Sequence, residues 1–268
     1  MQVRIFCILL HRHCTCQYAQ TPPNNTFPSQ QSIVGYETVT VAGSKYVALA
    51  VQFEGIGETT AIPVKDLVTV ASPSGAGSIG GGTDQIWRWD TAGNDWVKYF
   101  YRSGRGVTTP GWCKAGETAL TTDTISAGET CFFFRGGSST TTLTLSGAVK
   151  QFAATATYSV PGSSYVFMGY PWPVSFAIST MTDAYASGTP SGAGSIGGGT
   201  DQIWRWNTTG NDWDKYFYRS GRGVTTPGWC KAGETAITTD TIPAGEGFFF
   251  FRGGSSAVTI TFSYTSAN

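Results

Sequence analysis

Short runs of this chain alternate apolar and polar residues with the two-residue period that is typical of β-strands. In one such run, Trp87 and Trp89 fall on one face and Ile86 falls on the other. A second run, Asp95–Arg102, follows a Gly-Asn pair, which favours a tight turn between two strands. Because no long stretch has the 3.6-residue apolar period of a helix, the pattern predicts antiparallel β-structure with little helix.

The same hairpin sequence occurs twice in the chain. Residues 73–143 align with residues 190–260 at an offset of 117, and ten of the 71 aligned positions differ. The differing positions in the first copy are 90, 92, 97, 120, 126, 130, 131, 140, 141 and 143. A repeat of this length has the size of a common domain. The fold class we expect is all-β, with two tandem antiparallel β-sandwich or barrel-like domains from an internal duplication, at 32–146 and 147–268.

Three motifs mark the repeats. An Asp-x-Ile-x-x-Trp hairpin occurs in both copies. The Ala-Gly-Glu-x-Phe-Phe-Phe turn and strand has Cys131 in place of its first phenylalanine in the first copy, and the closing Thr-Leu-Thr-Leu strand of the first copy is Thr-Ile-Thr-Phe in the second. Together they resemble a repeated β-domain of secreted and surface proteins of some bacteria. The resemblance covers Val39–Ser146 and Tyr158–Ser263. It implies an extracellular or cell-surface location, and it transfers no catalytic residue to this chain.

Composition narrows the classes of function. Charged residues make up 13% of the chain and the net charge is zero, which argues against a nucleic-acid partner. Low charge also gives weak self-repulsion and favours association with other chains. His11 and His13 are the only histidines, so a histidine-based catalytic triad or metal site in the repeats is excluded. We expect no enzyme activity, no cofactor and no membrane span.

The first part of the chain differs from the repeats. Residues 1–20 contain a short apolar run after Arg4, which indicates a signal or leader segment. Residues 21–31 contain three prolines and form a Pro-rich arm. We therefore expect a secreted protein with an extended segment ahead of the first domain.

Eight aromatic residues of the repeated hairpin are candidates for a binding platform. They are Trp87, Trp89, Tyr99 and Tyr101, and their copies Trp204, Trp206, Tyr216 and Tyr218. Sugar rings stack on flat aromatic surfaces, and two platforms on one chain would gain by avidity. Core or inter-domain packing and subunit contact are the alternative interpretations.

Three cysteines lie in the repeats. Cys113 and Cys230 occupy the same repeat position, whereas Phe248 stands at the position of Cys131. A Cys113–Cys131 disulfide therefore cannot recur in the second copy. A disulfide and buried thiols both remain open for Cys113, Cys131 and Cys230.

The function that the sequence favours is a structural subunit of an extracellular filament. Its assembly would resemble that of donor-strand pilus-like fibres, with the N-terminal strand or arm of one subunit adding to the second domain of its neighbour. A head-to-tail contact of this kind gives an open homopolymer. The interface candidates are Ile33, Val34, Tyr36, Val39, Val41, Phe262 and Tyr264. The alternative is a carbohydrate-binding adhesin whose glycan partners bind the aromatic platforms.

Overall fold

The computed structural model describes residues 34–55, 61–76, 82–104, 107–149, 155–194, 199–221 and 223–263. Every strand pair among these residues is antiparallel. The helical segments within the described ranges are two 3-10 helices, η1 (Val64–Asp66) and η2 (Ile178–Ala184). The prediction of an all-β chain with little helix is confirmed.

A five-stranded sheet is the centre of the first half of the molecule. Its strands, in spatial order, are β2 (Tyr46–Ala50), β10 (Thr130–Phe134), β6 (Gln85–Asp90), β7 (Asp95–Arg102) and β8 (Gly111–Lys114). The hairpin of β6 and β7 has the predicted turn, where Asp90 pairs with Asp95. Asn94 takes the left-handed conformation with φ of 51°, which asparagine adopts more readily than most residues.

A smaller sheet covers one face of this sheet. It consists of β1 (Val34–Val41), β11 (Thr141–Val149) and β3 (Phe53–Glu54), with β5 (Thr69–Val70) also paired to β11. A separate pair joins β4 (Ala61–Pro63) to β9 (Thr124–Ser126). Side chains of both sheets form one buried core, including Val41, Leu143, Leu49, Ile86, Tyr99 and Phe133. The first half is therefore a β-sandwich.

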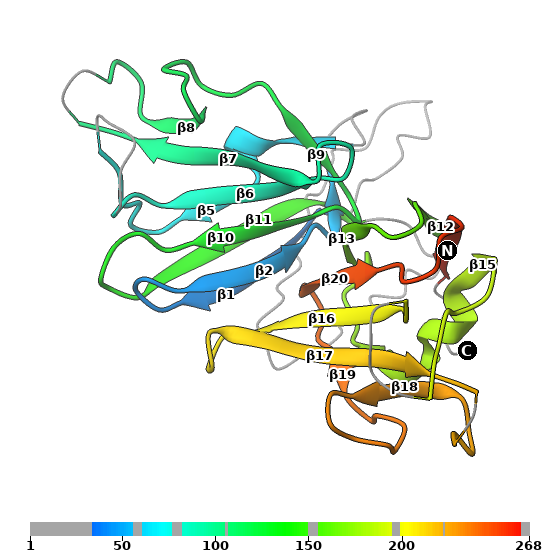
Figure 1. Ribbon diagram of the computed structural model, residues 1–268. Helices are drawn as coiled ribbons and strands as arrows, with labels where there is room; N and C mark the ends of the chain where they lie inside the picture. Colours follow the sequence, from blue (N-terminus) through cyan, green and yellow to red (C-terminus); the bar gives the residue numbers. More distant parts are fainter. Residues whose placement is uncertain are drawn as a thin grey trace, which may run out of the picture.

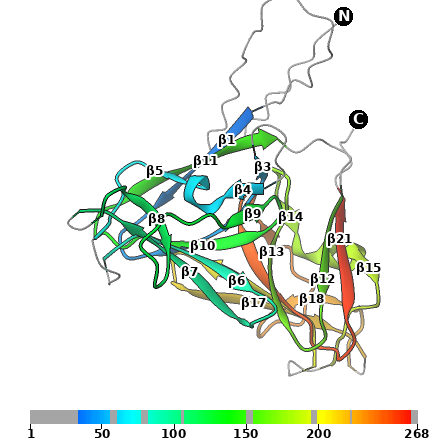
Figure 2. The same cartoon turned by 90° about the horizontal axis from the view of Figure 1, so that it is seen from above.

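The second half repeats this arrangement. Its five-stranded sheet has the order β13 (Tyr165–Gly169), β20 (Gly247–Phe251), β16 (Gln202–Asn207), β17 (Asp212–Arg219) and β18 (Gly228–Lys231). Its smaller sheet has the order β12 (Thr155–Val160), β21 (Val258–Ser263) and β15 (Tyr185–Ser187), which lie side by side in Figure 2. A short pair joins β14 (Phe176–Ala177) to β19 (Thr241–Ile242). A second core lies between the two sheets.

A buried ion pair fixes the start of the hairpin in each half. The Asp84 carboxylate accepts from the Arg135 guanidinium at 2.8 Å, and the side chains are 0% and 4% exposed. In the second half Arg252 donates to Asp201 at 2.7 Å. Backbone amides of Ser74 and Gly136 also donate to Asp84. Since buried charges need such partners, these contacts hold the loop before β6 against the end of β10.

The two sandwiches pack against each other through their larger sheets. Alternation on β6 points Ile86 into the first core and leaves Trp87 and Trp89 on the outer face, as the sequence predicts. That face meets the corresponding face of the second half in one aromatic cluster. The molecule thus has four β-layers, and Figure 1 shows β2, β10, β13 and β20 in its middle.

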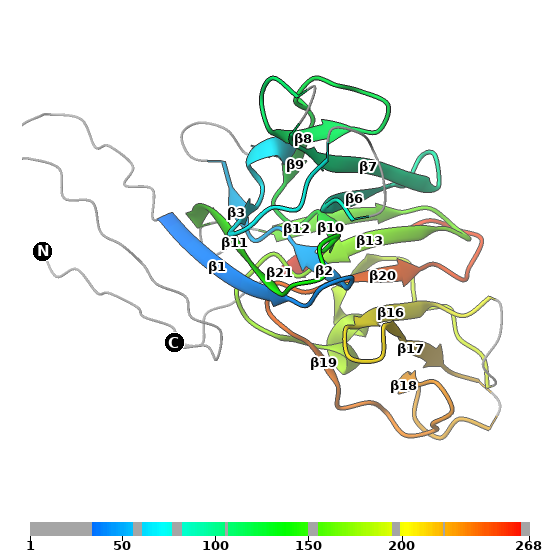
Figure 3. The ribbon, with the colours of Figure 1, turned by 90° about the vertical axis from the view of Figure 1, so that its left-hand side faces the viewer.

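Strand β1 belongs to the sandwich of its own first half. It lies along β11, with Val39 opposite Leu143 (Figure 3). Strand β12 occupies the same place beside β21 in the second half. Strand β11 continues to Val149, three residues beyond the boundary at 146 that the sequence indicates, and Ala148 and Val149 pair with β3. The first sandwich therefore includes Gly147–Val149.

Candidate functional site

The junction between the two halves is built from reciprocal contacts. The indole N–H of Trp89 donates to the carbonyl of Tyr165 at 3.1 Å. Its repeat copy Trp206 donates to the carbonyl of Tyr46, also at 3.1 Å. Tyr46 and Tyr165 hold corresponding places on β2 and β13, opposite Phe134 and Phe251. Each half therefore gives the other the same contact that it receives.

Backbone contacts follow the same rule. The Ala50 amide donates to the carbonyl of Gly245 at 2.9 Å, and the Gly169 amide donates to the carbonyl of Gly128 at 3.3 Å. Isolated bridges join Leu49 to Glu246 and Glu129 to Met168. An interface in which each side presents the same patch is isologous, as in a two-fold dimer. The junction therefore has pseudo-two-fold symmetry, and it covers the outer edges of β2 and β13.

The eight aromatic platform candidates are divided between two surfaces. Trp87, Trp89, Trp204 and Trp206 are half-buried at the junction. Tyr99 and Tyr216 are 0% exposed in the two cores, where their hydroxyls donate to Asp123 and Asp240 at 2.7 Å. Tyr101 and Tyr218 pack edge-on against Trp112 and Trp229. The tryptophans and the tyrosines thus lie on opposite faces of each sheet.

The interface candidates lie mostly within the sandwiches. Val39, Val41 and Phe262 are buried in the cores, Tyr36 is half-buried on β1, and Val34 is 38% exposed. Ile33 and Tyr264 lie outside the described residues.

The three cysteines of the repeats are free, buried thiols. Burial raises the pKa of Cys131 to about 12, and it also raises the pKa of Cys113 and of Cys230. No disulfide joins them, so the stability of both sandwiches depends on packing and hydrogen bonds.

A pocket of about 210 Å³ opens at one side of the junction. Three segments line it: the tip of the β16–β17 hairpin, the turn before β20, and strand β2 of the first half. The lining residues are Val47, Ala48, Arg205, Trp206, Asn207, Thr208, Thr209, Asp214, Pro243 and Glu246. Because β16 extends beyond the end of β20, its last residues face the turn instead of a strand. This leaves the space between them open.

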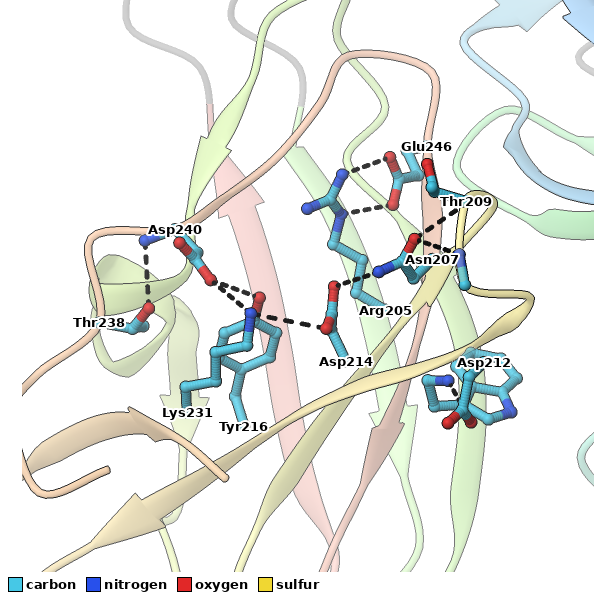
Figure 4. Close-up of polar contacts among 12 residues, drawn as sticks. Arg205, Asn207, Thr209, Asp212, Asp214, Tyr216, Lys231, Thr238, Asp240 and Glu246 are labelled. Atoms are coloured by element: carbon cyan, nitrogen blue, oxygen red, sulfur yellow. Dashed lines mark hydrogen bonds and ion pairs between the residues drawn. The ribbon is translucent and has the colours of Figure 1, made fainter. Parts of the chain in front are cut away.

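Polar side chains of the pocket hold one another in place (Figure 4). The Arg205 guanidinium donates to both oxygens of Glu246, at 2.6 and 3.2 Å. Burial lowers the pKa of Arg205, but the hydrogen bonds to Glu246 outweigh it and leave that pKa above its usual value. Lys231 lies 3.5 Å from Asp214 and 3.6 Å from Asp240. Arg205 is therefore paired with one carboxylate, and Lys231 is paired with two.

The turn between β16 and β17 holds the side-chain amide of Asn207 in one orientation. The Asn207 side-chain oxygen accepts from the backbone amides of Thr209 and Gly210, both at 3.0 Å. Its amide nitrogen lies 3.5 Å from the Asp214 carboxylate. This arrangement fixes the side-chain amide and points its donor group toward Asp214, as Figure 4 shows. The pocket therefore offers fixed donors and fixed acceptors within a small volume, and Trp206 is among its lining residues.

Sequence reasoning selected Trp206 but missed the rest of this pocket. A usable signal was present, because Asn207, Thr209, Asp214 and Pro243 are four of the ten positions at which the second copy differs from the first. Their counterparts are Asp90, Ala92, Val97 and Ser126. The contribution of Val47 and Ala48 depends on how the halves pack, and the repeat pattern does not specify it.

Comparisons with protein-family models, curated proteins and solved structures find no match to the chain. Among the residues that the structure describes, no group of three or more His, Cys, Asp or Glu side chains could hold a metal ion. No helix within the described ranges is long and apolar enough to cross a membrane.

Proposed function

We propose that this chain is a secreted or cell-surface carbohydrate-binding protein whose sugar ligand occupies the pocket beside Trp206. The observation that carries the proposal is that the lining of one small cavity includes a tryptophan, a side-chain amide and two carboxylate residues, which are Trp206, Asn207, Asp214 and Glu246. Binding pockets generally join an apolar surface to a few fixed polar groups that set orientation. A sugar ring needs both, because its C–H face is apolar and its hydroxyls are polar.

The aromatic wall is held before any ligand arrives. The Trp206 indole N–H is hydrogen-bonded to Tyr46, and its ring packs edge-on against Phe132 and Trp213 at centroid distances of 5.6 and 5.0 Å. A side chain that is already fixed loses little conformational freedom when a ligand binds. Trp206 is therefore a rigid part of the pocket wall.

The charges around the pocket favour a neutral ligand. Arg205 is paired with Glu246, and Asp214 is paired with Lys231. Each charged lining residue therefore already has an oppositely charged partner. Among these described lining residues, the pocket has no unpaired charge with which a charged ligand could pair. Sugar hydroxyls suit such a site, because a hydroxyl both donates to a carboxylate and accepts from an amide.

A binding measurement with one variant and one control tests this proposal. We expect a panel of neutral glycans to include a ligand that changes the tryptophan fluorescence of the full chain. Asp214→Val, which introduces the residue of the first copy, should weaken binding at least tenfold. Asp95→Asn, at the exposed tip of the other hairpin, should leave affinity unchanged because asparagine can still accept from the Trp96 amide. No response to any glycan would refute the proposal.

A second candidate is the filament subunit, and the position of β12 favours it. This strand pairs with β21 on one side and has no strand pair on its other side within the described residues. An outer edge offers unpaired amides and carbonyls to an added strand. The pseudo-two-fold junction closes on itself, so a head-to-tail contact would have to use such an edge.

Electron microscopy distinguishes this candidate from the first. The filament proposal expects fibres of the full chain that disappear when residues 1–31 are removed, while the truncated chain keeps its unfolding temperature. Particles of one chain at every concentration would rule out the filament and leave the sugar-binding proposal untouched.

A further inference from the structure

We infer that the junction face of each half accepts the face of the opposite half and rejects its own copy, and that two copies of this chain associate by exchanging halves through it. The partner is a second copy of the chain, with the first half of each molecule packed against the second half of the other. This inference concerns the junction and does not depend on either proposed function.

Each half has its own sheets and its own core. Apart from two isolated bridges across the junction, every strand pair among the described residues lies within one half. Each half also has its own hydrophobic core and its own buried ion pair. The chain passes from one half to the other once, between the end of β11 at Val149 and the start of β12 at Thr155. Exchange of halves between two molecules therefore breaks no sheet.

Near the pseudo-two-fold axis the first half supplies side chains and the second half leaves space for them. Thr130 pairs with Ala50 in the first half, and Gly247 pairs with Gly169 in the second. A Cβ atom added to Gly247 would overlap Cγ2 of Thr130, and one added to Gly169 would overlap Cβ of Ala50. Two first halves would thus place Thr130 and Ala50 against their own copies, where there is space for only one of each.

At another place the second half supplies the larger side chain. The Phe167 ring stacks on Phe132 and on Phe249, with centroid distances of 5.0 and 4.5 Å. Phe167 lies opposite Phe249 on β20. Ala48 has the corresponding place in the first half, opposite Phe132, and belongs to the same buried cluster. Two second halves would therefore bring two Phe167 rings into the space that one ring now fills over Ala48.

Each pair of like halves consequently has an overlap at one place and a void at another. Overlaps and voids in packed apolar surfaces both destabilise, and specificity is the difference in free energy between the right and the wrong pair. The pair of opposite halves has neither defect. An exchanged pair of chains contains this native junction twice and closes, because every half is then covered. Within one chain the link gives the halves a roughly millimolar effective concentration, so dilute wild-type protein remains a single chain.

Two full-length variants with complementary faces test the inference. Gly247→Thr places threonine at this position in both halves, and Thr130→Gly places glycine in both. Neither variant forms the native junction within its own chain. An exchanged pair with one chain of each kind has one threonine and one glycine at both of its junctions. After unfolding in urea and refolding together, the mixture should contain about tenfold or more two-chain particles than either variant refolded alone at the same total concentration. Sedimentation velocity measures their amount, and native mass spectrometry should show one chain of each variant in them.

The double variant Thr130→Gly with Gly247→Thr is the matched control. It contains both substitutions but restores one threonine and one glycine within each chain, so it should remain a single chain as the wild type does. Unfolding temperatures show which variants are folded. If Gly247→Thr does not fold, the second complementary pair, Gly169→Ala with Ala50→Gly, provides the same test.

Three results would overturn the inference. The first is an equal amount of two-chain particles in the mixture and in the separate variants. The second is two-chain particles that contain one variant only, which would show that like halves do pair. The third is a double variant that forms as many two-chain particles as the mixture, because its association would then not depend on the complementary faces.

Discussion

Thr130 and Gly247 occupy the same position in the two repeats and lie against each other at the junction. A Cβ atom added to Gly247 would overlap Cγ2 of Thr130. Ala50 and Gly169 show the same relationship, because a Cβ atom on Gly169 would overlap that of Ala50. Residues close to a two-fold axis meet their own copies, so space for one side chain has to be shared. The glycines therefore allow the two near-identical sheets to approach closely.

This relationship predicts strong coupling between positions 130 and 247. Gly247→Thr places two threonines in space for one, and overpacking of this kind costs about 1–3 kcal/mol of unfolding free energy. The exchange Thr130→Gly with Gly247→Thr should recover most of that loss, because it restores one threonine and one glycine. Urea unfolding of the two single variants and the double variant measures the coupling. Strict additivity of the single effects would show that the two positions do not share space.

The buried ion pairs predict that loss of their carboxylate lowers stability strongly, and by a similar amount in each half. Asp84→Asn leaves Arg135 without its carboxylate, and breaking a buried pair costs about 3–5 kcal/mol. Asp201→Asn should have a similar effect through Arg252, whose side chain is 8% exposed. Chemical denaturation of both variants checks this. A loss below about 1 kcal/mol in either would mean that the pair is not sealed from water.

The buried thiols predict slow alkylation. Cys131 is 0% exposed and burial raises its pKa to about 12, so the reactive thiolate is scarce at pH 8. Iodoacetamide should label Cys113, Cys131 and Cys230 in urea and leave them unlabelled in the native protein, as peptide mass spectrometry would show. Rapid native labelling of Cys131 would contradict the packed first core.

The Tyr99–Asp123 contact predicts that the stability of the fold depends on pH and falls in acid. The hydrogen bond from Tyr99 lowers the pKa of Asp123 below its ordinary value of 3.8, with a further contribution from Lys114 and against the effect of burial. A carboxyl whose pKa is depressed in the folded state stabilises the fold above its unfolded pKa, and this contribution is lost as the pH falls through the folded pKa. Asp123→Asn should therefore lower stability at pH 7, and the difference from wild type should shrink below pH 3.8. Unfolding curves at both pH values measure it, and a difference that is constant with pH would contradict the contact.

The sequence predicts the hairpins well because alternation depends on local geometry. It assigns Trp87 and Ile86 to opposite faces, and the structure confirms this. Alternation does not say what covers a face, so the junction between the halves could not be predicted. The pocket was missed for the same reason, since Ala48 reaches Trp206 only through that junction.

A crystal structure of the full chain with a bound methyl pyranoside is the most direct measurement of the proposed site. We predict a sugar in the pocket, with its hydroxyls hydrogen-bonded to Asp214 and Asn207. A sugar bound away from this pocket, or an empty pocket in crystals soaked well above the solution dissociation constant, would contradict the proposed site.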